Sequence, residues 1–290
     1  LLTILNLSSQ NPQELITDTN IANILEQSLK NSVNKNNKDF ESIFENFVNQ
    51  PEQMTYNDVL HIGLCWGNYV YNCFKVSINP DHNLLHKIDT AVLNFIVNLG
   101  LKNLPYEILS NFKSIERICG YLKYSDYEKK ALLCFDGMGW AEWLLLRRCL
   151  IEEFDIDCIE KPIFSMIPST TRISRSAVFS GKINEIYQSN YPNERKTFRE
   201  NFNHAELFKN SEPITEDSIL GYTTVAKIYN LFDETAHNTI LKQDDLSKNN
   251  YFNIAKLYLC RNSREMFNEI KVLLANNFKI FICSDHGCTA

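Results

Sequence analysis

Three short segments in the second half of the chain constrain its fold most, because each has the character of a buried strand. They cover residues 131–135, 223–232 and 278–283, and longer stretches of helical character separate them. A short, largely apolar run bounded by polar residues is typical of a parallel strand that is covered on both faces. Strands that alternate with helices predict an α/β fold with a doubly wound sheet.

The segments between these strands add further elements. Helical spacing of apolar residues predicts helices over residues 140–153 and 253–276. Residues 157–165 are predicted to hold one or two more strands. Residues 184–221 are polar and contain two prolines, so we interpret them as an insertion or a cap over the sheet.

The first 128 residues carry helical patterns, whereas strand patterns and catalytic spacings are absent there. We therefore expect two parts, an all-α N-terminal region over residues 1–128 and an α/β domain over residues 129–290. The chain begins with Leu1 and stops at Ala290 directly after a motif, which suggests a fragment of a longer protein. Within the first part, apolar spacing predicts helices over residues 21–33, 40–47, 56–74 and 84–101, and one or two more over residues 105–122.

Composition is that of a globular protein and excludes several classes of partner. Hydrophobic residues make up 44% of the chain and charged residues 22%, and the net charge is −6. The whole surface therefore does not attract nucleic acid. Residues 161–200 form a local basic patch, for which a solvated face of mixed charge is an equal alternative. No apolar run approaches the ~20 residues of a membrane span. Nine cysteines without a framework spacing indicate reduced thiols in a cytoplasmic protein.

Residues 166–181 predict a strand, a loop and a helix whose N-terminus carries hydroxyl groups. Pro168 ends the strand, three hydroxyl residues follow as N-cap candidates, and Gly181 is a good helix stop. Free N–H groups and the positive dipole end at such a helix N-terminus hold anions such as phosphate. Thr171 and Arg175 lie on one helix face, and a hydroxyl beside a guanidinium suits attack on a phosphoryl group. The alternative is an ordinary capped helix.

Each of the three predicted strands ends in a carboxylate, namely Asp136, Asp233 and Asp285. Ligand sites of parallel sheets form at the carboxyl ends of the strands, so we expect the three acids to lie close together. Three acids at one edge repel one another, which indicates a positive group among them. His237 and His286 accompany two of the acids, and carboxylates with imidazoles are ligands for zinc, manganese or iron.

Taken together, these motifs resemble the alkaline phosphatase superfamily, and most closely its PglZ-type branch. The resemblance covers residues 129–290 and implies an alkaline-phosphatase-like sheet flanked by helices, here preceded by the all-α region. It rests on residues 133–139 (LCFDGMG), 168–181 (PSTTRISRSAVFSG), 232–237 (FDETAH) and 283–287 (CSDHG).

The resemblance also implies roles for single residues. Thr171 resembles the nucleophile, and Arg175, with Arg172 as a second candidate, would contact a non-bridging phosphoryl oxygen. The family's remaining metal-ligand histidine lies further along the chain and has no match before Ala290. Two divalent ions, zinc or manganese, are implied. Their ligands would be Asp136, Asp285, His286 and Thr171 for one ion, and Asp233 and His237 for the other.

The implied function is that of a metal-dependent phosphohydrolase, a phosphodiesterase rather than a phosphomonoesterase. Two metal ions would activate Thr171 and hold the phosphoryl oxygens. The resemblance implies a bacterial phage-defence system or response-regulator proteins, with nucleic acid or a nucleotide as substrate and other defence proteins as partners. The competing hypothesis is a non-catalytic, metal-binding scaffold subunit of a defence complex that holds partners through residues 1–128. An enzyme needs Thr171, whereas a scaffold keeps partner binding after Thr171→Ala.

Overall fold

A parallel four-stranded sheet forms the centre of the computed structural model. The strands lie in the order β2-β3-β1-β4, and each neighbouring pair is parallel. The described part of the chain is therefore an α/β protein, as the alternating pattern predicts. The strands are β1 (Lys130–Phe135), β2 (Ala205–Phe208), β3 (Thr224–Tyr229) and β4 (Lys279–Ser284). The structure describes residues 40, 44–45, 48–49, 54–97, 114–167, 169–182, 193–240, 248–261 and 263–287.

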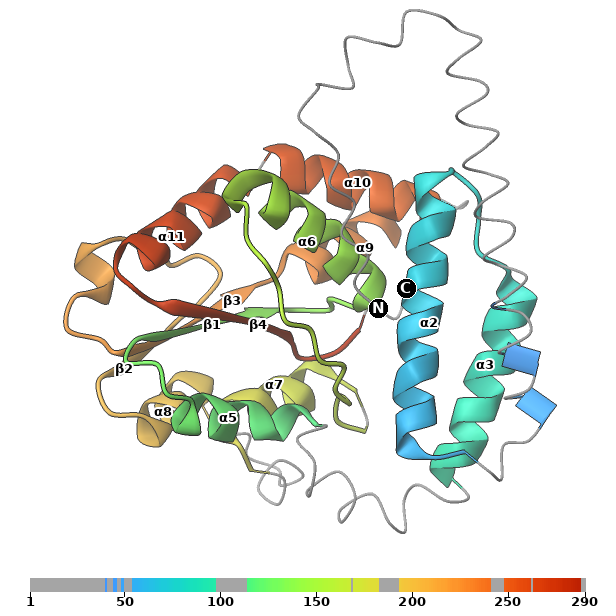
Figure 1. Ribbon diagram of the computed structural model, residues 1–290, viewed down its shortest axis with the longest axis horizontal. Coiled ribbons are helices and arrows are strands. Elements are labelled where there is room, and N and C mark those ends of the chain that lie inside the picture. The colour runs from blue at the N-terminus through green and yellow to red at the C-terminus, as the bar shows by residue number, and fades with distance from the viewer. Residues whose placement is uncertain are drawn as a thin grey trace, which may run out of the picture.

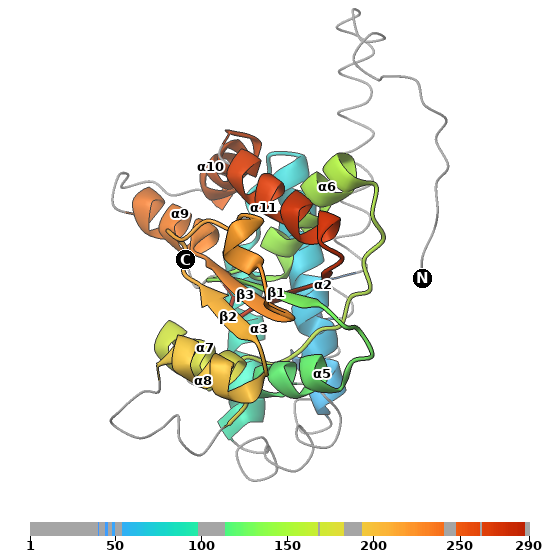
Figure 2. The same cartoon turned by 90° about the vertical axis from the view of Figure 1, so that its left-hand side faces the viewer.

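Helices cover both faces of the sheet and produce three layers (Figure 1, Figure 2). A short 3-10 helix, η5 (Asp217–Ile219), lies in the connection between β2 and β3. One face carries α6 (Trp140–Phe154), α9 (Leu231–Ile240), α10 (Lys248–Arg261) and α11 (Ser263–Ala275). The other face carries η4 (Ile115–Arg117), α5 (Ile118–Tyr124), α7 (Thr171–Ser180) and α8 (Glu194–Asn201).

Both faces of the sheet are apolar, because alternate residues of a strand point to opposite sides. In β1, Ala131, Leu133 and Phe135 pack into the core that includes residues of α6, α10 and α11. Leu132 and Cys134 pack into a second core with residues of α5 and α7. All residues of β1 are buried, as expected for a strand in the interior of a parallel sheet.

Three sequence predictions for this domain are wrong. Residues 157–165 form no strand and contribute a single bridge, between Phe164 and Ser114. The polar segment 184–221 is more than an insertion or cap, because it contains β2, a short strand that carries Glu206. In place of one helix over residues 253–276 there are two, α10 and α11.

The N-terminal helices within the described residues follow the sequence pattern. α2 (Tyr56–Lys75) matches the prediction for residues 56–74, and a capping box between Thr55 and Asp58 closes its first turn. α3 (His82–Phe95) begins two residues before the predicted start, because the side chain of Asp81 caps its N-terminus. Of the helix predicted over residues 105–122, the structure describes η4 and α5. The helix predicted over residues 21–33 lies outside the described residues.

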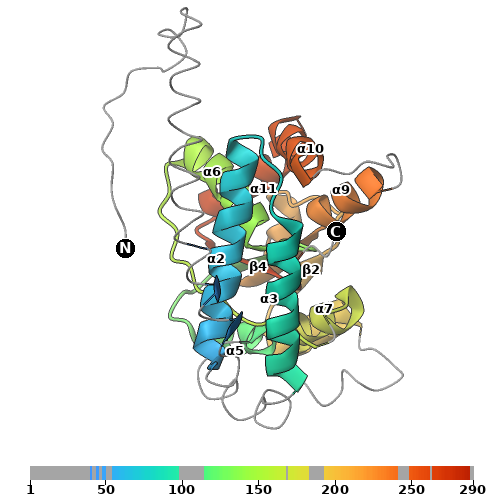
Figure 3. The same cartoon turned by 90° about the vertical axis from the view of Figure 1, so that its right-hand side faces the viewer.

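α2 packs onto the α/β part of the chain, with α3 alongside it (Figure 3). Tyr69, Val70 and Cys73 of α2 belong to the same hydrophobic core as β1 and α6. Gly67 faces Trp140, the first residue of α6, so closely that a Cβ on Gly67 would lie 2.6 Å from the Cβ of Trp140. The helical part and the sheet therefore share one core. None of the helices in the described ranges has the length and apolar character of a membrane span.

Candidate metal centre at the carboxyl edge of the sheet

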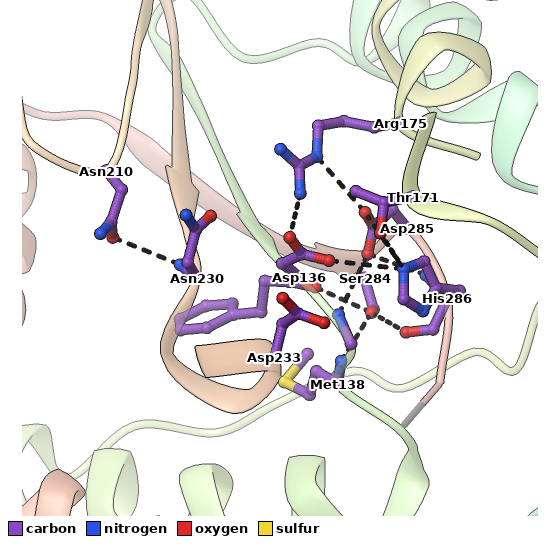
Figure 4. A network of polar contacts seen from close by, with 12 residues as sticks. Asp136, Met138, Thr171, Arg175, Asn210, Asn230, Asp233, Ser284, Asp285 and His286 are labelled. Atoms are coloured by element: carbon purple, nitrogen blue, oxygen red, sulfur yellow. Dashed lines mark hydrogen bonds and ion pairs between the residues drawn. The ribbon is translucent and has the colours of Figure 1, made fainter. Parts of the chain in front are cut away.

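The carboxyl ends of β1 and β4 bring the motif residues of two distant segments together. The two strands pair so that Phe135 lies opposite Ser284, and the next residues along the chain are Asp136 and Asp285. α7 begins at Thr171 on the same edge (Figure 4). β1 is buried and β4 is a partly exposed edge strand, and the polar residue that follows each strand lies at the edge of the sheet where ligand sites form.

Three potential metal ligands converge at this edge. Asp136, Asp285 and His286 each offer one ligand atom, and the three atoms lie within 4.8 Å of one another. Nε2 of His286 lies 3.4 Å from Oδ1 of Asp136 and 3.8 Å from Oδ2 of Asp285. The hydroxyl oxygen of Thr171 lies 2.8 Å from the same nitrogen. The structure thus gathers the residues that the sequence assigns to one ion.

The orientation of His286 distinguishes a ligand cluster from a proton relay. Its Nδ1 donates a hydrogen bond to the carbonyl oxygen of Gly287 at 2.9 Å, so the lone pair of the neutral ring is on Nε2. In a hydroxyl–imidazole–carboxylate relay, the carboxylate binds the ring nitrogen opposite the hydroxyl. Here Asp136, Asp285 and Thr171 all lie near Nε2, which is the arrangement of groups that share a cation.

Arg175 supplies the positive charge that the acids require. Its Nη2 donates a hydrogen bond to Oδ2 of Asp136, and its Nε lies 3.4 Å from Oδ2 of Asp285. Nη1 has no hydrogen bond to another residue in the part of the chain that the structure describes (Figure 4). The sequence predicts a contact between Arg175 and a phosphoryl oxygen, and Nη1 is the nitrogen that remains for it.

The charges of the cluster shift the pKa values of its members. Burial alone would raise the pKa of Asp136, but His286 and Arg175 outweigh burial and hold that pKa below its usual range. Burial, and then the charge of Asp136, raise the pKa of Asp285 to about 6. The contact with Asp136 raises the pKa of His286 to about 9, so the imidazole is protonated at neutral pH. A cation that binds His286 must therefore displace a proton.

Hydrogen bonds between the two loops hold the carboxylates in place. Oδ1 of Asp285 accepts the N–H of Gly137 at 3.2 Å and the N–H of His286 at 2.9 Å, which leaves Oδ2 for the cluster. The hydroxyl oxygen of Ser284 accepts the N–H of Met138 at 3.1 Å. Gly137 has a φ of 71°, a backbone conformation that favours glycine in this turn. Sequence reasoning missed Ser284, because a serine beside an acid carries no signal of its own.

The donor set fits a divalent ion. Oδ1 of Asp136 is buried and makes no hydrogen bond within the described residues, and the charge that faces it is the protonated imidazole of His286, whose Nε2 is 3.4 Å away. A divalent ion that displaces the proton of His286 would face this buried oxygen in its place. Two carboxylates and an imidazole suit zinc and manganese. Asp136, Asp285 and His286 would hold such an ion, with the hydroxyl of Thr171 next to it.

Asp233 and His237, the predicted ligands of a second ion, form a pair of their own on α9. Oδ1 of Asp233 lies 3.4 Å from Nε2 of His237, one helical turn further along, and the side chain of His237 is 72% exposed. The prediction that a strand over residues 223–232 ends in Asp233 is wrong, because β3 ends at Tyr229 and Asp233 is in the first turn of α9. Asp233 still lies beside the turn after β1, since a Cβ on Gly137 would be 3.5 Å from its Cβ. Within the described ranges, no third ligand joins this pair.

The basic patch predicted over residues 161–200 is largely neutralised where the structure describes it. Arg195 lies 3.3 Å from Glu206 and also pairs with Glu212. Arg199 pairs with Glu206 as well. These partners favour the alternative interpretation, a solvated face of mixed charge, over a nucleic-acid surface.

A scan of the chain against models of protein families found no match, and a search of curated proteins found none. The resemblance to the PglZ-type branch, and the activity that it implies, therefore stay predictions from the motifs.

Proposed function

We propose that this chain is a metal-dependent phosphohydrolase, and specifically a phosphodiesterase, in which the hydroxyl of Thr171 attacks phosphorus. The observation that carries the proposal is the convergence of Asp136, Asp285, His286 and Thr171 at the carboxyl edge of a parallel sheet. A hydroxyl nucleophile beside two carboxylates and an imidazole meets the requirements of metal-assisted phosphoryl transfer.

The chain supplies binding and orientation around the ion. A zinc or manganese ion bound by Asp136, Asp285 and His286 supplies Lewis-acid stabilisation of the phosphoryl oxygens and lowers the pKa of the neighbouring hydroxyl. Thr171 is the first residue of α7, a helix of 10 residues, so unpaired N–H groups and a positive dipole end lie beside the charge that develops on the phosphoryl group. Nη1 of Arg175 can donate a further hydrogen bond to it.

The reaction balances in two steps. First, the oxygen of Thr171 forms a bond to phosphorus and the bond from phosphorus to the leaving alcohol breaks. The hydroxyl proton passes to water, and the departing alkoxide takes a proton from water. Next, a water molecule attacks the phosphothreonine, the oxygen of Thr171 leaves and regains a proton, and a phosphomonoester is released. We assign Asp233 and His237 to a second ion, as the family resemblance implies.

Hydrolysis of bis-p-nitrophenyl phosphate and p-nitrophenyl phosphate tests the proposal. The full chain is assayed with zinc and then with manganese, beside Thr171→Ala and the matched control Thr170→Ala. Thr170 is the N-cap residue of α7, but its side chain makes no capping hydrogen bond, so turnover should stay within about twofold. Loss of the nucleophile should lower turnover by at least about 10³-fold. Chelation of the metal should abolish it.

The outcomes separate the candidate functions. Metal-dependent turnover of the diester that is lost in Thr171→Ala and kept in Thr170→Ala would support the proposal. Turnover of the monoester alone would keep the nucleophile and overturn the substrate class. An intact fold that binds metal and hydrolyses neither ester would favour the non-catalytic scaffold.

The cellular setting is proposed on separate grounds. The cysteines that the structure describes are free thiols, which supports a reducing compartment such as the cytoplasm. A role in phage defence or response regulation, with other defence proteins as partners, rests on the resemblance alone.

A further inference from the structure

A pocket adjoins the candidate metal centre and shares Arg175 with it. The pocket has a volume of about 360 Å³, within the range of small-molecule sites. It includes residues at and beyond the carboxyl ends of β2 and β3, whereas the ligand cluster lies at the ends of β1 and β4. Figure 4 shows Asn210 and Asn230 on the side of Arg175 that is away from His286. One ester group of a phosphate bound beside Thr171 would therefore reach into this pocket.

Two acceptor groups line the pocket wall, and one of them lacks a hydrogen-bond partner within the described residues. Oδ1 of Asn230 is buried and has no hydrogen-bond partner within the described residues, although the N–H of Asn230 donates to Oδ1 of Asn210 at 3.2 Å. The carboxylate of Glu194 lies 3.9 Å from Nε of Arg175 and lines the same pocket. An unpaired buried amide oxygen costs free energy, which a ligand that donates a hydrogen bond would recover.

Donor groups lie in the same wall. Lys209, Ser211 and the amide nitrogen of Asn210 line the pocket together with Arg175, whose Nη1 is available. The apolar residue among the described lining residues is Ile228, so a hydrocarbon group would leave most of the wall unpaired. A hydroxyl both donates and accepts, so a group with several hydroxyls matches this mixture. Aromatic side chains, on which nucleobases stack, are absent from that lining.

We propose that this pocket binds a non-aromatic, hydroxylated alcohol, a sugar or a polyol, that is esterified to the phosphate. The position of the phosphate rests on the proposed function, whereas the choice of alcohol rests on the pocket itself. The substrate is then a sugar or polyol phosphoester.

Ligand-observed NMR titration with glucose 6-phosphate and phenyl phosphate tests the assignment, because both probes carry the same charged group. The full chain carries Thr171→Ala to prevent turnover, and Asn230→Leu is compared in that background. Leucine has the branched shape of asparagine, is somewhat larger and has no polar atoms, so the variant removes the unpaired oxygen and the amide donor without opening a cavity. Asn253 is exposed on α10, and Asn253→Leu provides the matched control.

We expect glucose 6-phosphate to bind at least about tenfold more tightly than phenyl phosphate, and Asn230→Leu to weaken it about tenfold. The melting temperature should stay the same or rise in Asn230→Leu, whereas a merely structural role would lower it. Equal or tighter binding of phenyl phosphate, unchanged affinity in Asn230→Leu, or no binding would overturn the assignment. If the expected pattern appears and the metal-loaded chain hydrolyses no ester, the proposed function fails and the pocket assignment stands.

Discussion

Two glycines of α2, Gly63 and Gly67, allow the packing of this helix against α6 to be tested, because the same substitution, to alanine, can be made at both. Both lie inside the helix, where replacement of glycine by alanine stabilises by about 0.5–1 kcal/mol. A Cβ on Gly63 has nothing within 4 Å. A Cβ on Gly67 would lie 2.6 Å from Cβ and 2.9 Å from Cδ1 of Trp140. Overpacking of this kind costs about 1–3 kcal/mol.

The two substitutions should change the free energy of unfolding in opposite directions. The closest atom at Gly67 is the Cβ of Trp140, which moves only with the backbone of α6, so we take the upper part of the range, about 2–3 kcal/mol. After the helix gain, Gly67→Ala should destabilise by about 1–2.5 kcal/mol, whereas Gly63→Ala should stabilise by about 0.5–1 kcal/mol. The melting temperature should then fall by about 2–10 °C in the first variant and rise by about 1–4 °C in the second.

The same contact reaches the metal ligands through a short chain of neighbours. Trp140 follows Gly139, whose Cα would be 3.7 Å from a Cβ on Gly287. The carbonyl oxygen of Gly287 accepts the hydrogen bond that orients His286. Displacement of Trp140 should therefore weaken Mn²⁺ binding about tenfold in Gly67→Ala, the effect of disturbing a group that orients a ligand. Gly63→Ala should bind Mn²⁺ as the unchanged chain does.

Thermal and urea unfolding, followed by circular dichroism, measure the first effect, and calorimetric titration with Mn²⁺ measures the second. Equal stabilisation by Gly63→Ala and Gly67→Ala would refute the contact between α2 and Trp140. A loss of stability in Gly67→Ala with unchanged Mn²⁺ affinity would keep the contact and refute its connection to the site.

Three further outcomes are expected. Mn²⁺ must displace the proton of His286, whose pKa is about 9, so affinity should rise about tenfold per pH unit between about pH 7 and 8.5. Calorimetry should detect one released proton per ion, and an affinity independent of pH would contradict this. Glu269→Ala leaves Lys227, whose side chain is 2% exposed, with an unpaired buried charge and should lower the free energy of unfolding in urea by about 3–5 kcal/mol. The double variant Lys227→Met, Glu269→Leu should recover part of the loss, because the N–H of Ile214 and the hydroxyl of Tyr229 still lack the carboxylate of Glu269 to which they donate. A double variant as unstable as Glu269→Ala would refute the ion-pair argument. Ser284→Ala removes the acceptor of the Met138 N–H and should weaken Mn²⁺ binding about tenfold by calorimetry, and an unchanged affinity would show that Ser284 does not position the loop.

Parts of the fold that depend on residues close together in the sequence could be predicted from the sequence. β1, β3 and β4 have largely apolar runs, and Asp136 and Asp285 directly follow two of them. Local patterns therefore predict which acids lie at the carboxyl edge of the sheet. The helix that begins at Thr171 is bracketed by hydroxyl residues and by Gly181, which has a φ of 66°. β2 could not be predicted, because it is short and the charge of Glu206 is balanced only by arginines of another element.

Contacts between distant segments could not be read from the sequence. Arg175 binds Asp136 and Asp285 because α7 crosses the ends of β1 and β4, and helical spacing reports only which face of α7 Arg175 shares. The unpaired amide oxygen of Asn230 likewise depends on what surrounds it in space. The contact between Gly67 and Trp140 joins two helices whose patterns are each complete on their own.

The loops that carry the two acids come from opposite ends of the α/β part, and this sets the order of events during synthesis. Phe135 and Ser284, which precede the acids, are 149 residues apart. At a translation rate of about 5–20 residues per second, Asp285 is added about 7–30 s after Asp136. During that interval β1 has no β4 beside it, and pairing over so long a separation is intrinsically slow. A nascent chain therefore has no preformed cluster with which to capture an ion. The ion of the proposed function would therefore bind only after β4 has been synthesised and has paired with β1.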